Sequence, residues 1–273
     1  MMNWSVDINE FFQDLQDECA AELDPQHFIF DQDSLVRVEL NDLSISSLPS
    51  SISKITGLRE IQLRNNLLTS LPESLEELQQ LTEVSLSGNR FKEIPDCLYH
   101  LPNIRILHFV KNQLKGLLTQ INTWIHLREL ALAHNDISSL PDTIGELSNL
   151  RELSLSRNPL TSLPETLSHL KELSFLFCYS CSLQELPENF GELKKLEKVD
   201  FSNNQIKKLP ENLVNLIDLK NLDLQNNRIN SISENILSMK SLQFLNLSDN
   251  PLSKATRDMI SERLDKHNLK IIL

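Results

Sequence analysis

The sequence predicts an α/β solenoid, because a unit of 23 residues recurs along most of the chain in constant register. Leu127–Asn149 is LRELALAHNDISSLPDTIGELSN, and Leu150–Glu172 repeats it closely as LRELSLSRNPLTSLPETLSHLKE. A fixed period of this length is typical of stacked structural repeats. Ten units follow one another without insertion, and they begin at Leu35, Leu58, Leu81, Ile104, Leu127, Leu150, Leu173, Leu196, Leu219 and Leu242. We therefore expect one elongated domain that is stabilised by contacts between neighbouring units.

Each unit divides into a strand half and a turn half. Leu130 and Leu132 alternate with other residues, and this period of two predicts a short strand with alternate side chains inside and outside. From Leu140 to Leu147 the apolar residues are three or four apart, which predicts a short helix or 3₁₀ turn on the opposite face. The strands of successive units should form one parallel sheet of ten strands, and no unit can bury its own apolar face alone.

An asparagine recurs directly after the strand in most units. A buried amide has donors and an acceptor, so it can satisfy backbone groups of its own and the neighbouring unit. We expect the loss of one such side chain to cost about 1–3 kcal/mol. Leu43 and Cys181 replace the asparagine in the first and seventh units, and the column consists of Asn66, Asn89, Asn112, Asn135, Asn158, Asn204, Asn227 and Asn250.

The repeated pattern L-x-x-L-x-L-x-x-N-x-L-x-x-L-P-x-x-L-x-x-L resembles that of the leucine-rich repeat superfamily over residues 35–252. The resemblance is to its 23-residue intracellular LPxxL type, which includes Ras-pathway scaffolds, related plant proteins and effectors injected by intracellular bacteria. It implies a right-handed horseshoe with the strands on the concave face and short helices or 3₁₀ turns on the convex face. It also implies that a protein partner binds on the concave face.

The two ends of the array need caps, because the end units would otherwise expose their core. We predict an N-terminal helical cap over residues 1–34, the ten repeats over 35–252, and a C-terminal helix–strand cap over 253–273. The apolar face of a helix over residues 6–23 would cover the first unit with Ile8, Phe11, Phe12, Leu15 and Cys19. An alternative is that this helix docks on a partner or directs the protein.

The C-terminal cap should begin with a helix from Lys254 to about Asp265, with Ser253 as its N-cap residue. A closing strand over residues 269–273 would then protect the edge of the last repeat. The apolar residues of the helix that should face this repeat are Ala255, Met259, Ile260 and Leu264.

Charge and cysteine usage narrow the classes of partner and compartment. The net charge of -12 argues against nucleic acid or an anionic membrane as the main partner. No apolar run is long enough to cross a membrane, and the acidic N-terminus does not resemble a signal peptide. Cys178 and Cys181 could indicate zinc or redox chemistry, but no second pair accompanies them, so buried thiols are the favoured interpretation. With Cys19 and Cys97 the chain has four cysteines, and their interpretation as reduced thiols favours the cytoplasm, or a host cytosol reached by a secreted bacterial protein.

Two units depart from the pattern. In the fourth unit, Leu118 replaces the proline and Trp124 replaces a leucine, which predicts a repacked core with a local change in curvature. In the seventh, FLFCYSCSL replaces the usual small polar strand. Its alternation places Phe175, Phe177 and Tyr179 on the outward face of the sheet.

Outward strand positions carry three features against a small polar background: an acidic one (Glu60, Glu83, Glu129 and Glu152), a basic one (Lys111, His134 and Arg157) and the aromatic one. Contiguous exposed apolar side chains usually mark an interaction site. An alternative is that the rings only pack on one another or lie under a loop. The candidate partner-binding residues are Phe175, Phe177, Tyr179, Glu152, Arg157, Lys198, Asp200, His108, Lys111 and His134.

These observations predict a non-enzymatic module that binds proteins as an adaptor, an inhibitor or a bacterial effector, and acts as a monomer without metal or cofactor. A self-associating structural protein is the first alternative. The second is an enzyme, because His108, His134 and Asp200 could supply acid–base groups. No phosphate loop, zinc motif or nucleophile paired with a base supports that alternative.

Overall fold

The computed structural model describes residues 5–18, 23–263 and 269–273. The chain forms two compact units, which we describe separately. The first unit comprises Met1–Lys115 and Gln120–Asn135, and the second comprises Gly116–Thr119 and Asp136–Leu273. The organisation as one domain with boundaries at residues 34 and 252 stays a prediction.

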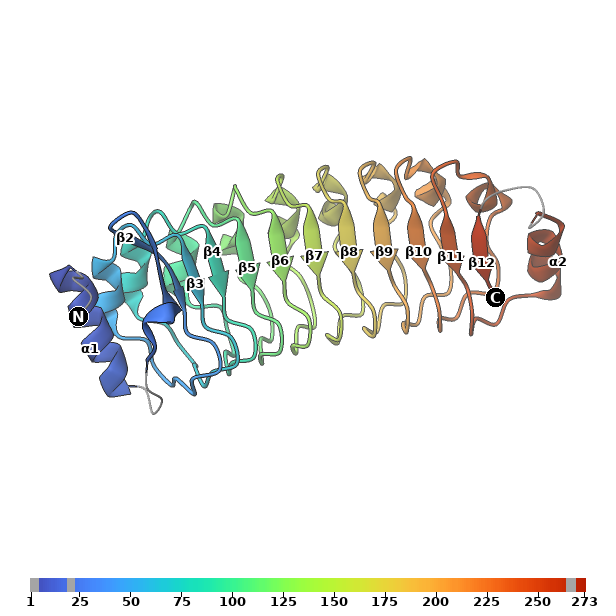
Figure 1. Cartoon of the computed structure of the whole chain (residues 1–273). Coiled ribbons are helices and arrows are strands. Elements are labelled where there is room, and N and C mark those ends of the chain that lie inside the picture. Colours follow the sequence, from blue (N-terminus) through green and yellow to red (C-terminus); the bar gives the residue numbers. More distant parts are fainter. Residues whose placement is uncertain (1–4, 19–22, 264–268) are drawn as a thin grey trace. The chain divides into compact units, whose positions relative to one another are not determined.

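In the first unit, the strands lie side by side in chain order (Figure 1). They are β1 (Phe28–Asp31), β2 (Ser34–Glu39), β3 (Glu60–Gln62), β4 (Glu83–Ser85), β5 (Ile106–His108) and β6 (Glu129–Ala131). From β2 to β6 the pairing is parallel, and each residue faces the residue 23 positions further on, as Glu60 faces Glu83. β1 instead pairs antiparallel with β2. The repeat period thus sets the strand register directly.

In the second unit, all the described strand pairs are parallel. The strands are β7 (Glu152–Ser154), β8 (Phe175–Phe177), β9 (Lys198–Asp200), β10 (Asn221–Asp223), β11 (Phe244–Asn246) and β12 (Lys270–Ile272). β12 is the predicted closing strand, and it pairs with β11. The described residues therefore carry twelve strands, two more than the ten repeat strands β2–β11.

The turn halves of the repeats form 3₁₀ helices, as predicted. Most of them follow a proline in an extended conformation, which occupies the N-cap position of the 3₁₀ helix, as Pro72 (φ -65°) does before η3. In the first nine repeats their bounds are η2 (Ser50–Lys54), η3 (Glu73–Glu77), η4 (Asp96–His100), η5 (Thr119–Thr123), η6 (Asp142–Glu146), η7 (Glu165–His169), η8 (Phe190–Glu192), η9 (Glu211–Asn215) and η10 (Glu234–Ser238). A further 3₁₀ helix, η1 (Pro25–His27), lies before the first repeat. Most consensus leucines of both halves are buried between strands and turns, and the half-buried ones belong to the turn half: Leu71, Leu117, Leu140 and Leu209.

Helix α1 (Val6–Glu18) packs against η2 at the start of the first unit. Its residues Ile8, Phe11 and Leu15 are buried, and Phe11 meets the ring of Phe28 edge-on at 6.4 Å. The polar side of the helix is also attached, because Ser51 Oγ donates to Asp14 Oδ2 at 2.5 Å. These contacts place α1 over the first repeat.

The predicted extent of this helix is wrong at its C-terminal end. Leu23 lies outside any helix, and Cys19 lies outside the described residues. The Asp24 side chain accepts a hydrogen bond from the Gln26 N–H and so caps η1. An aspartate before a proline is a strong N-cap signal, and here it begins a new turn.

Helix α2 (Lys254–Arg263) contacts η10 in the second unit. Ser253 is its N-cap, as predicted, because Ser253 Oγ accepts from the Thr256 N–H at 3.2 Å. Ile260 is buried, but the prediction that Ala255 faces the last repeat is wrong, since Ala255 is exposed. Thr256 takes the inner position because it lies one helical turn before Ile260. Leu264 and Asp265 lie outside the described residues.

The fourth repeat has the predicted repacked core. Trp124 is fully buried and stacks on Tyr99, with ring centroids 5.0 Å apart. Its indole N–H donates to the Leu98 carbonyl at 2.8 Å. The larger ring is therefore accommodated with its polar atom paired, which a buried tryptophan requires. Leu118, in the place of proline, is 47% exposed.

The asparagine column makes the predicted contacts between repeats. Asn204 Oδ1 accepts from the Leu183 N–H at 3.0 Å, and Nδ2 donates to the carbonyls of Cys178 and Phe201 at 2.8 and 2.9 Å. Equivalent contacts recur at Asn89, Asn112, Asn227 and Asn250. Cys181 replaces them with only weak thiol contacts, at 3.5 Å to the Leu155 carbonyl and 3.8 Å to the Tyr179 carbonyl.

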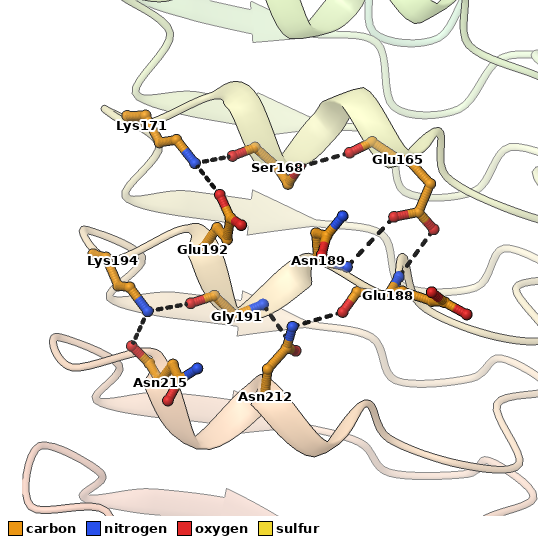
Figure 2. A network of polar contacts seen from close by, with 10 residues as sticks. All are labelled: Glu165, Ser168, Lys171, Glu188, Asn189, Gly191, Glu192, Lys194, Asn212 and Asn215. Atoms are coloured by element: carbon orange, nitrogen blue, oxygen red, sulfur yellow. Dashed lines mark hydrogen bonds and ion pairs between the residues drawn. The ribbon is translucent and has the colours of Figure 1, made fainter.

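On the turn face of the second unit, side chains join consecutive repeats (Figure 2). Lys171 Nζ contacts the Ser168 carbonyl at 2.8 Å and Glu192 Oε2 at 2.7 Å. Asn212 accepts from the Gly191 N–H and donates to the Glu188 carbonyl at 2.6 Å. Gly191 has to be a glycine, because a Cβ there would lie 1.9 Å from the Asn212 carbonyl oxygen. The polar groups of this face are thus used to hold the repeats together.

Candidate protein-binding surface

The eighth position of every repeat has a left-handed backbone. The residues are Asp42, Asn65, Gly88, Lys111, His134, Arg157, Ser180, Asn203, Asn226 and Asp249, with φ between 50° and 71°. Glycine, asparagine and aspartate tolerate this conformation, whereas other L residues are disfavoured in it by about 1 kcal/mol. Lys111, Arg157 and Ser180 depart from that local preference, whereas histidine, as at His134, is itself enriched in this conformation. Departures of this kind are typical of functional positions.

In the first unit, several charged residues of the outward sheet face have polar partners on the same face. Arg37 Nε forms an ion pair with Glu60 Oε2. Gln62 Nε2 donates to Glu83 Oε1 at 2.6 Å, and His108 Nε2 lies 2.6 Å from Glu129 Oε1. The acidic feature predicted from the sequence is therefore largely satisfied inside the protein.

Three candidate residues belong to this unit. His108 is half-buried beside Glu129, and Lys111 is exposed. The Lys111 N–H donates to the Ala133 carbonyl at 2.9 Å, so its backbone is held while its side chain extends outward. His134 is half-buried on the next repeat. The structure thus brings these residues to the predicted face and uses His108 in an internal contact.

The other seven candidates belong to the second unit. We define the aromatic surface as Phe175, Phe177 and Tyr179. Leu176 and Cys178, which alternate with them, are fully buried, as the period of two predicted. Phe175 is 37% exposed, and Phe177 and Tyr179 are half-buried. Among the described residues, the aromatic pairs in ring contact involve other side chains, so the three rings do not pack on one another.

Two cations lie over rings of this surface. Arg157 Cζ is 5.7 Å from the centroid of Tyr179, and Lys198 Nζ is 5.5 Å from the centroid of Phe177. Both distances are within the range of a cation–π interaction. Sequence reasoning placed these cations next to the aromatic surface but did not predict the stacking. The signal for it was the pairing of neighbouring repeats, which places the eighth residue of one repeat and the strand residues of the next beside the aromatic side chains.

The acidic candidates flank the same strand. Phe175 faces Glu152 on β7 and Lys198 on β9, and Phe177 faces Asp200, as the register predicted. Asp200 Oδ1 accepts from the N–H and the hydroxyl of Ser202 at 2.9 and 2.7 Å. Asp200 therefore holds the turn after β9, a role that the sequence did not indicate.

The described cysteines are free thiols. Burial raises the pKa of Cys178 well above its ordinary value, raises that of Cys181 less strongly, and raises the pKa of Cys97 to about 12. All three therefore stay protonated and poorly reactive near neutral pH. No cluster of three potential metal ligands occurs in the described part of the chain. Cys19 lies outside it.

Four family models match the chain. A leucine-rich repeat region matches residues 102–199, and other leucine-rich repeat models match residues 56–114, 194–236 and 241–262. The chain belongs to the leucine-rich repeat superfamily, and its fold is the solenoid of that superfamily. No curated protein matches the chain.

Solved structures agree with this assignment. A leucine-rich repeat protein of Leptospira interrogans has 28% identity and a TM-score of 0.64, and the match covers 88% of this chain and 72% of that one. The functional domain of InlJ from Listeria monocytogenes has 22% identity and a TM-score of 0.72, with 87% and 48% covered.

The ectodomain of the Arabidopsis thaliana receptor kinase GASSHO1/SCHENGEN3, in complex with CASPARIAN STRIP INTEGRITY FACTOR 2, has 24% identity and a TM-score of 0.72. The match covers 83% of this chain and 32% of that one. This chain thus spans less than half of the Listeria and plant chains. Within the residues described, no helix is long and apolar enough to cross a membrane.

Proposed function

We propose that this protein is a non-enzymatic protein-interaction module that binds a protein partner on the outward face of β7–β9. The observation that carries the proposal is the aromatic surface, because three neighbouring outward aromatic side chains, two on β8 and one in the turn after it, are costly to expose to water. Aromatic residues can each bury about 150–250 Å² at an interface. The flanking Glu152, Arg157, Lys198 and Asp200 supply the polar rim that surrounds most binding hot spots.

A related structure supports the same kind of function. The plant receptor ectodomain shares this fold and was solved in complex with CASPARIAN STRIP INTEGRITY FACTOR 2. We propose that the present chain acts as an adaptor, an inhibitor or a bacterial effector, and that it is a monomer. A self-associating structural protein is the alternative, and light scattering at several concentrations distinguishes the two, because only self-association makes the mass increase with concentration.

We also propose a cytoplasmic location, either in the producing cell or in a host cell that receives the protein. The free thiols of Cys97 and Cys178, which are buried, and of Cys181, which is half-buried, support a reducing compartment. Alkylation of the unfolded chain without reductant should label all four cysteines. A smaller mass shift in protein isolated from its natural source would contradict this proposal.

The test of the binding site is the double substitution Phe177→Ala with Tyr179→Ala. The wild-type protein is used to capture partners from cytosol, and each identified partner is then titrated against both proteins. We expect the double substitution to weaken binding by about 2–4 kcal/mol. The melting temperature should change little, because the substituted rings are outside the core.

Phe244→Ala is the matched control, since Phe244 is another half-buried outward aromatic residue with a cation over its ring, Lys270 Nζ at 5.9 Å. It lies on β11, outside the proposed surface, so partner binding should survive its loss. The proposal fails if the double variant binds as well as the wild type. It also fails if the double variant unfolds, because the rings would then belong to the core.

A further inference from the structure

The two cations over the aromatic surface contact aromatic rings but form no ion pair among the described residues. No carboxylate of the described residues lies within ion-pair distance of Arg157 or Lys198, although the chain has 38 Asp and Glu against 26 Lys and Arg. Elsewhere in the same unit, some exposed lysines do pair with acids. Lys171, Lys195 and Lys220 pair with glutamates at 2.6–2.7 Å. An acidic chain that leaves these two cations without a carboxylate has two positive groups available at this surface.

Arg157 is also held in position. The left-handed backbone of Arg157 (φ 57°) directs its side chain, and the Tyr179 ring lies under the guanidinium. A ring that supports the face of a guanidinium leaves the N–H groups at its edge free to donate. That planar edge matches a carboxylate in a bidentate arrangement. Because the side chain is already ordered, less entropy is lost when a ligand binds.

The acids near these cations do not neutralise them. Asp200 is two residues after Lys198, but one of its oxygens accepts from both the N–H and the hydroxyl of Ser202. Lys198 Nζ lies over Phe177 instead. The local arrangement is therefore an apolar centre, formed by Phe175 and Phe177, with a cation on each of the two neighbouring repeats.

From this arrangement we propose that the partner presents an acidic segment of polypeptide, with an apolar side chain seated on the aromatic surface and carboxylates paired with Arg157 and Lys198. This inference rests on the proposed function and names the chemistry of its partner. The net charge of -12 repels polyanions in general, so a carboxylate alone would not suffice. Binding requires the apolar side chain and the carboxylates together.

The test is selection of binders from a random decapeptide library by the full chain. We expect the enriched peptides to combine an aromatic or leucine residue with Asp or Glu. The affinity of one enriched peptide is then measured for Arg157→Gln, Lys198→Gln and the double variant. Each single substitution should weaken binding about threefold, and the pair about tenfold, as is typical when an exposed charge pair is removed. Lys207→Gln is the matched control, because Lys207 is exposed and lies outside the surface; it should have no effect.

A second measurement assigns the effect to charge pairing. Changing the peptide's Asp and Glu to Asn and Gln should weaken binding to the wild type and have little further effect on the double variant, because the same interaction cannot be lost twice. The inference is overturned if the selected peptides are neutral or basic, or if acidic peptides bind the double variant unchanged. If no peptide is selected, or if the selected peptides still bind the Phe177→Ala, Tyr179→Ala protein, the proposed function itself fails as well.

Discussion

The outward sheet faces of the two units use their charged side chains differently. On the first unit, Arg37 pairs with Glu60, and His108 contacts Glu129. On the second, Arg157 and Lys198 lie over aromatic rings and have no carboxylate partner among the described residues. Internal pairs of this kind satisfy a surface, whereas exposed rings and unpaired cations leave interactions to be made by another molecule. The same repeat architecture thus carries one face on which charged side chains pair within the protein and another on which two cations have no carboxylate partner.

The same contrast extends to the backbone beneath the two faces. Asn112 in the first unit makes a full set of hydrogen bonds to the Phe91 N–H and the Leu86 and Phe109 carbonyls. Cys181, directly after the aromatic surface, makes only weak thiol contacts. Of these two repeats, the one that carries the candidate site therefore has the weaker connection to its neighbour.

The largest expected effect tests this difference in the backbone. Asn112→Ala should destabilise the protein by about 1–3 kcal/mol, because buried backbone groups lose their partners. Cys181→Ala should cost clearly less, since a thiol is a weak donor. Urea denaturation of both variants measures the difference. Equal losses would contradict it.

Cys181→Asn provides the converse control. An asparagine at this position supplies the carbonyl acceptor that the thiol lacks, so the free energy of unfolding should rise above that of the wild type. A destabilised Cys181→Asn protein would mean that the seventh repeat has adapted its packing to the cysteine.

The next effect concerns Arg157, whose backbone is left-handed and whose guanidinium lies over Tyr179. Arg157→Asn should stabilise the protein by about 1 kcal/mol, because asparagine tolerates this conformation better than arginine. The same substitution removes the guanidinium from Tyr179, so partner binding should weaken while the melting temperature rises. Asn65→Gly, at the equivalent position of the first unit, is the control and should leave binding unchanged. A loss of stability in Arg157→Asn would show that the cation–π contact outweighs the backbone preference.

A smaller effect separates the two charged faces. Arg37→Gln should lower stability by about 0.2–1 kcal/mol, as expected for an exposed ion pair, and leave partner binding unchanged. Lys198→Gln should do the opposite, with stability preserved and binding weakened. Thermal unfolding and partner titration of both variants test the contrast, which fails if either variant changes both properties.

The smallest effect concerns the turn face and depends on pH. The hydrogen bond from Lys171 lowers the pKa of Glu192. A carboxyl whose folded pKa is lowered contributes stability above its unfolded pKa, and this stability is lost as the pH falls through the folded value. Lys171→Gln should therefore reduce the melting temperature slightly at neutral pH, and the difference should vanish well below the ordinary glutamate pKa of about 4.3. Lys171→Arg should preserve the pH dependence, and neither variant should alter partner binding.

A feature of the fold or of the candidate site could be predicted from the sequence when it is set within a single repeat, and not when it is set by contacts between repeats. The period of 23 residues determined the positions of strands β2–β11, the 3₁₀ turns, the buried leucines and the role of the asparagine column. It also placed Phe175, Phe177 and Tyr179 on the outward face. These features follow from a local pattern that is copied from repeat to repeat, so a single unit already contains the information.

Only the tertiary structure decided which side chains of neighbouring repeats contact each other. The pairing of Arg37 with Glu60, the stacking of Arg157 on Tyr179 and the use of Asp200 by its own turn all depend on rotamers and on the left-handed eighth position. The ends differed for a related reason. Ala255 is exposed and α1 ends before Leu23, because a helix outside the repeats has no copied pattern to fix its limits and is set by its packing against one neighbour. The period of the sequence therefore specified the scaffold, whereas contacts across repeats specified the surface that a partner would meet.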